Sequence, residues 1–271
     1  MNPTIKNLEF PDLEQIAQFQ PPDWSDVTPR FREHFGQDYY YPVKAVVNNT
    51  MVGIGQLMLN RETAWLGNII VHPDFRKRGI GRLVTRHLMA EAINRGKKLQ
   101  LLLATLEGAP LYEKLGFMVE GEYHFFKKEP KFIGIHDISY HIFLYQDKFL
   151  EAILALDAAA TGEDRSAILQ RFLSDSQVYL NEEKEVEGFY MPSLGEGLVV
   201  ANTPRGGTSL VRLREMQGNF YNVIPTQSGE ALRYLHAEGY QYFRKAILMR
   251  YGEMKSWKPE MIYSRVGGYL G

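Results

Sequence analysis

Hydrophobic residues in this chain follow two periods, and the change from one period to the other predicts alternating helices and strands. Residues 81–96 are expected to form an amphipathic helix, because their apolar positions fall on one stripe and Gly96 then stops the helix. The stripe consists of Leu83, Val84, Leu88, Ala92 and Ile93. Residues 99–105, LQLLLAT, form a continuous apolar run, which is typical of a strand buried on both faces.

The remaining pattern of the first half predicts strands joined by short helices. Two β-type runs flank Asn48 and Asn49, which tolerate positive φ, so residues 43–59 are expected to form a hairpin. Residues 120–128 alternate like an edge or closing strand. The other expected elements are helices at 13–20, 25–35 and 109–117 and a strand at 64–73.

The second half repeats this order in a weaker form, and LHAEGY matches YEKLGF when Gly239 is aligned with Gly116. The segment KKEP, at 127–130, is charged, closed by a proline and near the middle of the chain. We therefore expect two domains, residues 1–128 and 129–271, the second a diverged repeat of the first. The expected elements are helices at 149–173, 208–216 and 229–240, a hairpin at 177–193 and strands at 197–204, 219–225 and 243–252.

Composition limits the functions open to this chain. Its 31 Lys and Arg against 32 Asp and Glu give a formal net charge of −1, which argues against binding to nucleic acid or a membrane surface. The absence of cysteine excludes disulfides, thiolate metal sites and a Cys nucleophile. No apolar run approaches the roughly 20 residues of a membrane span, and the first residues do not have the pattern of a secretory signal. We expect a cytoplasmic protein without a metal and leave its oligomeric state open.

One loop concentrates positive charge within this neutral chain. The segment RKRGIG follows a predicted strand and opens the helix at 81–96. Its glycines let the backbone turn and approach a ligand, and the first N–H groups of a helix attract an anion. The sequence therefore favours a phosphate site, although a basic turn leading into an amphipathic helix explains the loop equally well.

The spacing R-x-x-G-x-G in this loop is followed, at 111–117, by LYEKLGF. Together the two motifs resemble the GNAT superfamily of N-acetyltransferases, over roughly residues 5–128. The longer segment LLLATLEGAPLYEKLGF resembles a subgroup whose chains carry a second, degenerate GNAT-like domain. The resemblance implies an α/β (α+β) fold with a mixed, mostly antiparallel sheet, flanking helices and a splayed central strand pair. This arrangement would be present twice, in tandem GNAT-like domains.

The resemblance also implies an acetyl-CoA-dependent transfer of an acetyl group directly to a primary amine, taken to be a small molecule. Tyr112 matches the family's general acid, and a phenol with a pKa near 10 stays protonated at neutral pH, although packing would also explain this residue. The cofactor would contact the strand before the loop and the loop itself. These residues are Ile69, Ile70, Val71, Arg76, Lys77, Arg78, Gly79, Ile80, Gly81 and Arg82.

The chain departs from the family pattern at two places. Thr105 is the nearest match to an Asn that contacts the cofactor in many members. The strand TAWLGNIIV lacks the Glu that some members use to deprotonate the amine, so the general base is unassigned. The candidates are a water chain, a terminal carboxylate at Gly271, and the side chains of Glu62, Glu107, Glu122 and His124.

The second half is expected to be non-catalytic, because Leu235 stands where Tyr112 would align and leucine cannot donate a proton. Its expected role is to cover the first domain and shape the acceptor site. Residues 19–35 are also expected to shape that site, and their charged and aromatic members would attract an ammonium or form a solvated helix face. They are Asp23, Trp24, Asp26, Glu33 and His34.

Two other functions remain open at this stage. A non-catalytic acyl-CoA-binding or regulatory protein would keep the phosphate loop and use Tyr112 only for packing. Acetylation of protein lysines or N-termini would need an open groove, which a covering second domain disfavours.

Overall fold

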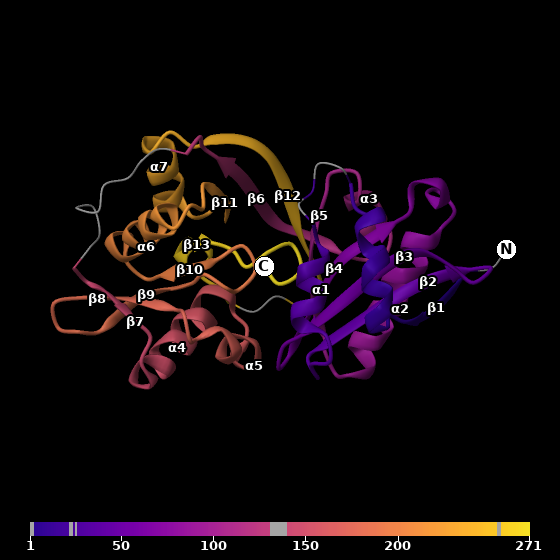
Figure 1. The fold of residues 1–271 in the computed structure, drawn as a ribbon, viewed down its shortest axis with the longest axis horizontal. Coiled ribbons are helices and arrows are strands. Elements are labelled where there is room, and N and C mark those ends of the chain that lie inside the picture. Colours follow the sequence, from indigo (N-terminus) through magenta and orange to yellow (C-terminus); the bar gives the residue numbers. More distant parts are fainter. Residues whose placement is uncertain (1–2, 22–23, 25, 131–139, 254–255) are drawn as a thin grey trace.

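The computed structural model describes residues 3–21, 24, 26–130, 140–253 and 256–271. They form two lobes side by side, and the strands β6 and β12 run between the lobes (Figure 1). The first half contains β1 (Thr4–Asn7), the 3-10 helix η1 (Phe10–Gln18), α1 (Thr28–His34), β2 (Tyr40–Val47), β3 (Thr50–Leu59), β4 (Thr63–Val71), η2 (Pro73–Phe75), α2 (Ile80–Asn94), β5 (Leu99–Ala104), α3 (Ala109–Glu113) and β6 (Met118–Lys127).

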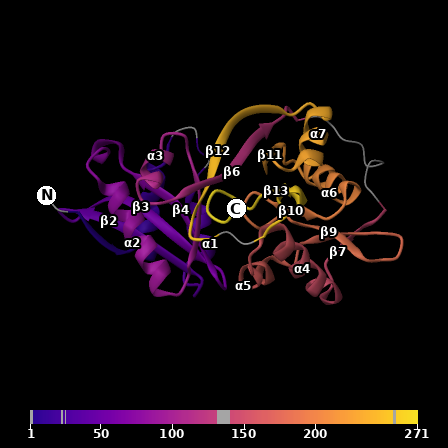
Figure 2. The ribbon, with the colours of Figure 1, turned by 180° about the vertical axis from the view of Figure 1, so that it is seen from behind.

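The second half follows a related order. It contains β7 (Ile142–Leu144), η4 (Asp147–Phe149), α4 (Leu150–Thr161), α5 (Ser166–Leu169), η5 (Gln170–Phe172), β8 (Gln177–Leu180), β9 (Val186–Met191), β10 (Leu198–Ala201), α6 (Pro204–Met216), β11 (Tyr221–Pro225), α7 (Gly229–Ala237), β12 (Gln241–Tyr251), η6 (Pro259–Met261) and β13 (Ile262–Ser264). The end of the described chain lies between the two lobes, as the views from the front and from behind both show (Figures 1 and 2).

The strands form two mostly antiparallel sheets. The larger has the order β1-β2-β3-β4-β5-β12-β6-β11, and the smaller has the order β13-β10-β9-β8-β7. Within the larger sheet β4 and β5 pair in parallel, over Thr63–Trp65 and Leu99–Leu101 only. A mixed, mostly antiparallel sheet flanked by helices was expected from the sequence, and this fold class is confirmed.

The two halves exchange strands within the larger sheet. Strand β12, from the second half, lies between β5 and β6, and β6 lies between β12 and β11. The prediction that residues 120–128 form an edge or closing strand is therefore wrong. The physical reason is that β6 buries aromatic side chains on both faces, with Tyr123 and Phe125 in one hydrophobic core and Phe126 in the other. The predicted domain boundary at residue 128 therefore remains a proposal. The second half places β12 beside β5 of the first half, and β6 of the first half pairs with β11 of the second.

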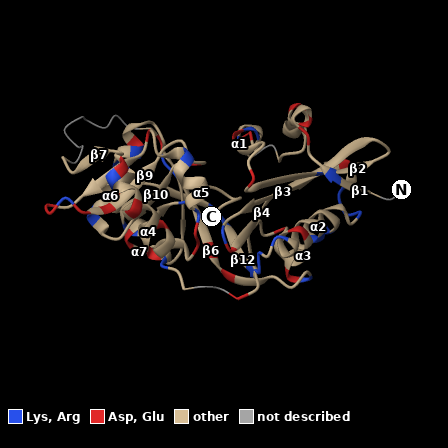
Figure 3. Ribbon diagram, turned by 90° about the horizontal axis from the view of Figure 1, so that it is seen from below, with Lys and Arg blue, Asp and Glu red and all other residues tan. Residues whose placement is uncertain are grey.

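The helices of the first lobe cover both faces of its sheet. Helix α1 lies on one side of β3 and β4, and helices α2 and α3 lie on the other (Figure 3). Helix α2 packs closely on β3, since a Cβ on Gly55 would lie only 2.6 Å from Val84 Cγ1. Strand β3 needs a glycine there because a larger residue would push the helix away from the sheet.

The close approach of α2 to β3 gives a stability prediction. Gly55→Ala should lower the free energy of unfolding by about 1–3 kcal/mol, because the added methyl overpacks the interface with Val84 and Leu88. Thermal unfolding followed by circular dichroism measures the change. Gly229→Ala is the matched control, since a Cβ there meets no atom within 4 Å. Equal melting temperatures for the two variants would contradict the packing argument.

Most predicted elements are present, with differences at their ends. The hairpin turn at Asn48 and Asn49 is confirmed, with φ of 49° and 64°. The helix expected at 13–20 is instead the 3-10 helix η1. The single helix expected at 149–173 is interrupted at Gly162, where φ is 70°, so Glu163 lies in a turn between α4 and α5. Strands β1, β7 and β13 were not predicted.

Candidate active site

The candidate site begins where β4 and β5 separate. The two strands pair only as far as Trp65 and Leu101, yet β4 continues to Val71 and β5 to Ala104. Ile69, Ile70 and Val71, the strand residues predicted to bind the cofactor, lie on the part of β4 that still follows β3 but no longer pairs with β5. Their backbone groups on the β5 side are therefore available to a ligand that lies along the gap.

A β-bulge lies just beyond the point where β4 and β5 separate. Residues Asn68 and Ile69 of β4 stand opposite the single residue Gly55 of β3, because the register passes from Gln56–Gly67 to Ile54–Ile70. Asn68 has a φ of 49°, which asparagine tolerates better than most residues. A bulge bends a strand and increases its twist, and this one lies in the part of β4 that no longer pairs with β5.

The positive loop lies at the open end of the gap. Arg76 Nε donates a 3.1 Å hydrogen bond to the carbonyl oxygen of Val71, which ties the loop to the last residue of β4. Helix α2 begins at Ile80, after Gly79 in the left-handed region with a φ of 79°, and Leu83 N donates the first intrahelical bond to Gly79 O. The N–H groups of the preceding residues therefore have no intrahelical acceptor.

Charged side chains surround these N–H groups. The predicted cations Arg76, Lys77, Arg78 and Arg82 are all exposed, and Arg78 lies over the ring of Phe75, 5.2 Å from its centroid. Lys77 itself adopts a left-handed φ of 59°, which the sequence pattern did not predict. The loop, the helix N-terminus and the end of β4 thus combine into one positively charged surface that suits an anion.

Helix α3 closes the same end of the site. A Cβ on Gly81 would lie 3.6 Å from Leu111 Cδ2 and 3.8 Å from Val71 Cγ2, so α3, α2 and β4 meet there. The ring of the neighbouring Tyr112 packs edge-on against Phe117, with centroids 6.0 Å apart. Burial raises the pKa of Tyr112 to about 12, so the phenol keeps its proton at neutral pH. Thr105 lies in the turn before α3, where its Oγ1 accepts a hydrogen bond from Gly108 N at 3.1 Å.

The candidate bases from the sequence are dispersed. Glu62 is exposed in the turn that precedes β4, six residues before Asn68. Glu107 is exposed in the turn before α3. Glu122 pairs with Lys245 at 2.7 Å and lies 3.6 Å from His124. The hydrogen bond from Lys245 lowers the pKa of Glu122.

The residues of 19–35 that were predicted to shape the acceptor site have different surroundings in the structure. Asp23 lies outside the described residues, and Trp24 is half-buried. Asp26 accepts a 2.8 Å hydrogen bond from Thr28 N at the start of α1. Burial raises the pKa of Glu33, and burial together with the charge of Arg171 lowers the pKa of His34 to about 4. His34 is therefore neutral at physiological pH.

The end of the second half reaches the first lobe beside the bulge. A Cβ on Gly67 would lie 2.5 Å from Tyr269 Cβ, and one on Gly271 would lie 2.6 Å from Trp65 Cζ2. The segment that contains Tyr269 and Gly271 thus covers β4 from Trp65 to Gly67. Sequence reasoning proposed that the second half covers the first, but it did not single out Tyr269.

The corresponding gap in the second lobe is filled by the chain itself. Strand β13 pairs with β10, and Arg265 N donates a 3.1 Å hydrogen bond to Val223 O of β11. Residues 262–265 therefore lie between β10 and β11. These strands precede and follow α6, as β4 and β5 precede and follow α2. Leu235, aligned with Tyr112, is buried in the hydrophobic core of that lobe.

Comparisons with known proteins agree with this architecture. The acetyltransferase (GNAT) family model matches residues 5–117, and a model described as an acetyltransferase (GNAT) domain matches residues 153–264. The ribosomal protein bS18-alanine N-acetyltransferase of Salmonella typhimurium is 33% identical over 125 residues, which cover 42% of this chain and 80% of that relative.

Two solved structures share the fold across both lobes. A candidate acetyltransferase from Pyrococcus horikoshii matches with a TM-score of 0.83 and 21% identity, over 99% of this chain and 96% of its own. A tandem GNAT protein from the clavulanic acid biosynthesis pathway matches with a TM-score of 0.61 and 13% identity, over 94% of this chain and 100% of its own.

The splayed strands, the helix N-terminus and these matches together define an acyltransferase. The chain belongs to the GNAT family of acetyltransferases and carries two domains of that family. In the described residues no helix is long and apolar enough to cross a membrane.

Proposed function

We propose that the first lobe transfers the acetyl group of acetyl-CoA directly to a primary amine of a small molecule. The observation that carries this proposal is the gap between β4 and β5, which opens toward the positive loop at the start of α2. The pantetheine arm would lie along Ile69–Val71 and pair with backbone groups there. The pyrophosphate would bind the N–H groups of residues 76–82, with the exposed cations around it.

The transfer itself needs few groups. A backbone N–H near Val71 would polarise the thioester carbonyl, and the neutral amine would attack the carbonyl carbon. A C–N bond forms, the C–S bond breaks, and Tyr112 gives its proton to the departing CoA thiolate. The amine loses a proton to a base. No covalent enzyme intermediate is required, which suits a chain with no cysteine.

A small acceptor is favoured by the cover over β4. Tyr269 and Gly271 lie against Gly67 and Trp65, on the strand that the acetyl group would contact. The Salmonella relative acetylates an alanine of a ribosomal protein. Because Tyr269 and Gly271 cover this strand, we expect turnover of a panel of small primary amines to exceed turnover of a peptide with an N-terminal alanine. Released CoA can be measured with a thiol reagent without background from the protein, because the chain contains no cysteine. Faster turnover of the peptide would overturn the small-molecule assignment.

The filled gap in the second lobe predicts the binding stoichiometry. Calorimetric titration of acetyl-CoA should give one site per chain, because β13 occupies the space between β10 and β11. The matching loop of that lobe, before α6, also lacks the R-x-x-G-x-G spacing. Two equivalent sites per chain would show that residues 262–265 leave the gap when the ligand binds.

A further inference from the structure

A small, partly open cavity lies at the apex of the gap between β4 and β5. Its volume is about 20 Å³, and Trp65 and Leu101, the last paired residues of the two strands, both line it. A cavity of roughly 10–15 Å³ is enough for one water-sized group. Part of its wall comes from the second half, including Leu198, Ile262 and Leu270. Both lobes therefore build this cavity, and it adjoins the strands that would hold the acetyl donor.

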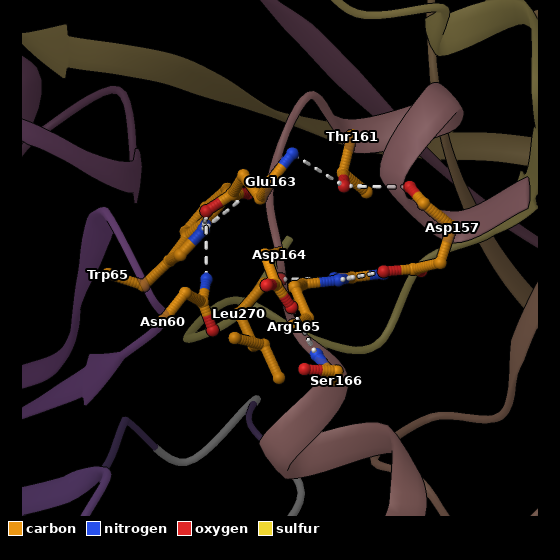
Figure 4. A network of polar contacts seen from close by, with 9 residues as sticks. All are labelled: Asn60, Trp65, Asp157, Thr161, Glu163, Asp164, Arg165, Ser166 and Leu270. Carbon is orange, nitrogen blue, oxygen red and sulfur yellow. Dashed lines mark hydrogen bonds and ion pairs between the residues drawn. The ribbon is translucent and has the colours of Figure 1, made fainter. Parts of the chain in front are cut away.

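One wall of the cavity carries a buried carboxylate from the second half. Glu163, in the turn between α4 and α5, is 5% exposed and points toward β4 (Figure 4). Its Oε2 accepts hydrogen bonds from Asn60 Nδ2 at 2.8 Å, from Thr63 Oγ1 and from Trp65 Nε1 at 3.1 Å, and its Oε1 accepts only from the same Trp65 Nε1, at 3.0 Å. These three donor groups are neutral, and a carboxylate has about four acceptor positions. Oε1 therefore has room for a further donor.

The neighbouring arginine has its own partner. Arg165 also lines the cavity, but its Nε and Nη2 bind both oxygens of Asp157, at 3.0 and 2.5 Å, and its Nη1 donates to Leu270 O at 2.9 Å. In Figure 4 the Arg165 side chain runs toward Asp157 and away from Trp65. The formal charges of Glu163, Asp157 and Arg165 sum to −1. Burial raises the pKa of Glu163 despite the nearby Arg165, so a cation at the cavity would relieve an unfavourable charge.

The rest of the lining fits an alkylammonium group. Trp65, Tyr123 and Trp257 line the cavity, and aromatic ring faces attract cations. The other lining side chains are mainly aliphatic, including Leu248 of β12. A carboxylate, aromatic rings and an aliphatic surface together suit an ammonium on a slender apolar stem.

We propose that this cavity binds the amine end of the acceptor, an unbranched primary alkylammonium, with Glu163 as its hydrogen-bond and charge partner. The inference rests on the proposed function for the identity of the acetyl donor, but amine binding can be measured without acetyl-CoA. The small volume excludes groups branched next to the nitrogen, and Glu163 disfavours anions.

The test is a titration of the protein with n-butylammonium chloride, followed by tryptophan fluorescence. Two of the three tryptophans, Trp65 and Trp257, line the cavity and report on it. The wild type should show a saturable change with n-butylammonium, and binding of tert-butylammonium and of n-butanol should be at least about tenfold weaker. Equal binding of n-butylammonium and n-butanol would overturn the proposal, and this comparison needs no variant.

Two variants separate charge recognition from structure. Glu163→Gln keeps the shape and an acceptor oxygen for Trp65, and it should weaken n-butylammonium binding at least about tenfold. Asp164→Asn is the matched control, because it removes the same charge from the next residue, which does not line the cavity. That control should bind n-butylammonium like the wild type. Equal affinities of the wild type and Glu163→Gln for this probe would contradict the role of Glu163.

Measuring acetyl-CoA binding separates failure of the proposed function from failure of the inference about the cavity. Glu163→Gln should bind acetyl-CoA with the affinity of the wild type, because Glu163 does not contact the phosphate loop. Absence of acetyl-CoA binding in the wild type would remove the proposed function, whatever the amine titration shows. Intact acetyl-CoA binding without selective n-butylammonium binding would remove only the inference about the cavity.

Discussion

The double variant Gly79→Asp/Gly81→Asp should lose at least about 100-fold in acetyl-CoA affinity while it stays folded. Two carboxylates would stand beside the N–H groups at the start of α2 and repel a pyrophosphate. Loss of two charge-assisted hydrogen bonds, at about 1.5–3 kcal/mol each, accounts for an effect of this size. Calorimetric titration of acetyl-CoA measures it directly.

The structure indicates that this variant can fold. A Cβ on Gly79 meets no atom within 4 Å, and one on Gly81 lies at ordinary contact distances from Leu111 and Val71. The positive φ of Gly79 adds a cost of about 1–2 kcal/mol. Gly96→Asp is the matched control, because Gly96 also has a positive φ and open space around it but follows the other end of α2. Wild-type affinity in the double variant would show that the loop does not hold the phosphates.

The second large effect is expected for Tyr112→Phe. If the phenol protonates the departing thiolate, its removal should lower kcat by on the order of 10²–10⁴, with little change in the affinity for acetyl-CoA. Since burial raises the pKa of Tyr112 to about 12, its ionisation should not reduce activity below about pH 11. Steady-state kinetics over a range of pH, with CoA release as the readout, measures both properties.

A neighbouring tyrosine supplies the control for packing. Tyr251 contacts the same Phe117 ring, with centroids 5.9 Å apart, so Tyr251→Phe makes the same chemical change against the same neighbour. It should leave kcat within a factor of about two to three of the wild type. A wild-type kcat in Tyr112→Phe would reject the general-acid role and leave Tyr112 as a packing residue beside Phe117.

The positive loop at the start of α2 could be predicted from the sequence because all of its chemistry is local. Arg76, Gly79 and Gly81 are close in the chain, and a strand followed by a helix fixes their geometry without distant contacts. The hairpin at Asn48 and Asn49 was predictable for the same reason. The bulge at Asn68 was not predicted, since it depends on the register between β3 and β4. A single sequence does not specify that register.

The sequence by itself determined the local elements, the repeated order of the two halves and the motifs at the start of α2 and in α3. Only the tertiary structure decided that the halves exchange β6 and β12, that β13 fills the second gap, and that Glu163 reaches Trp65 across 98 positions of chain. Local periodicity reports which face of an element is buried, but not which partner buries it. Those pairings depend on long-range packing, so they emerge only when both halves fold together.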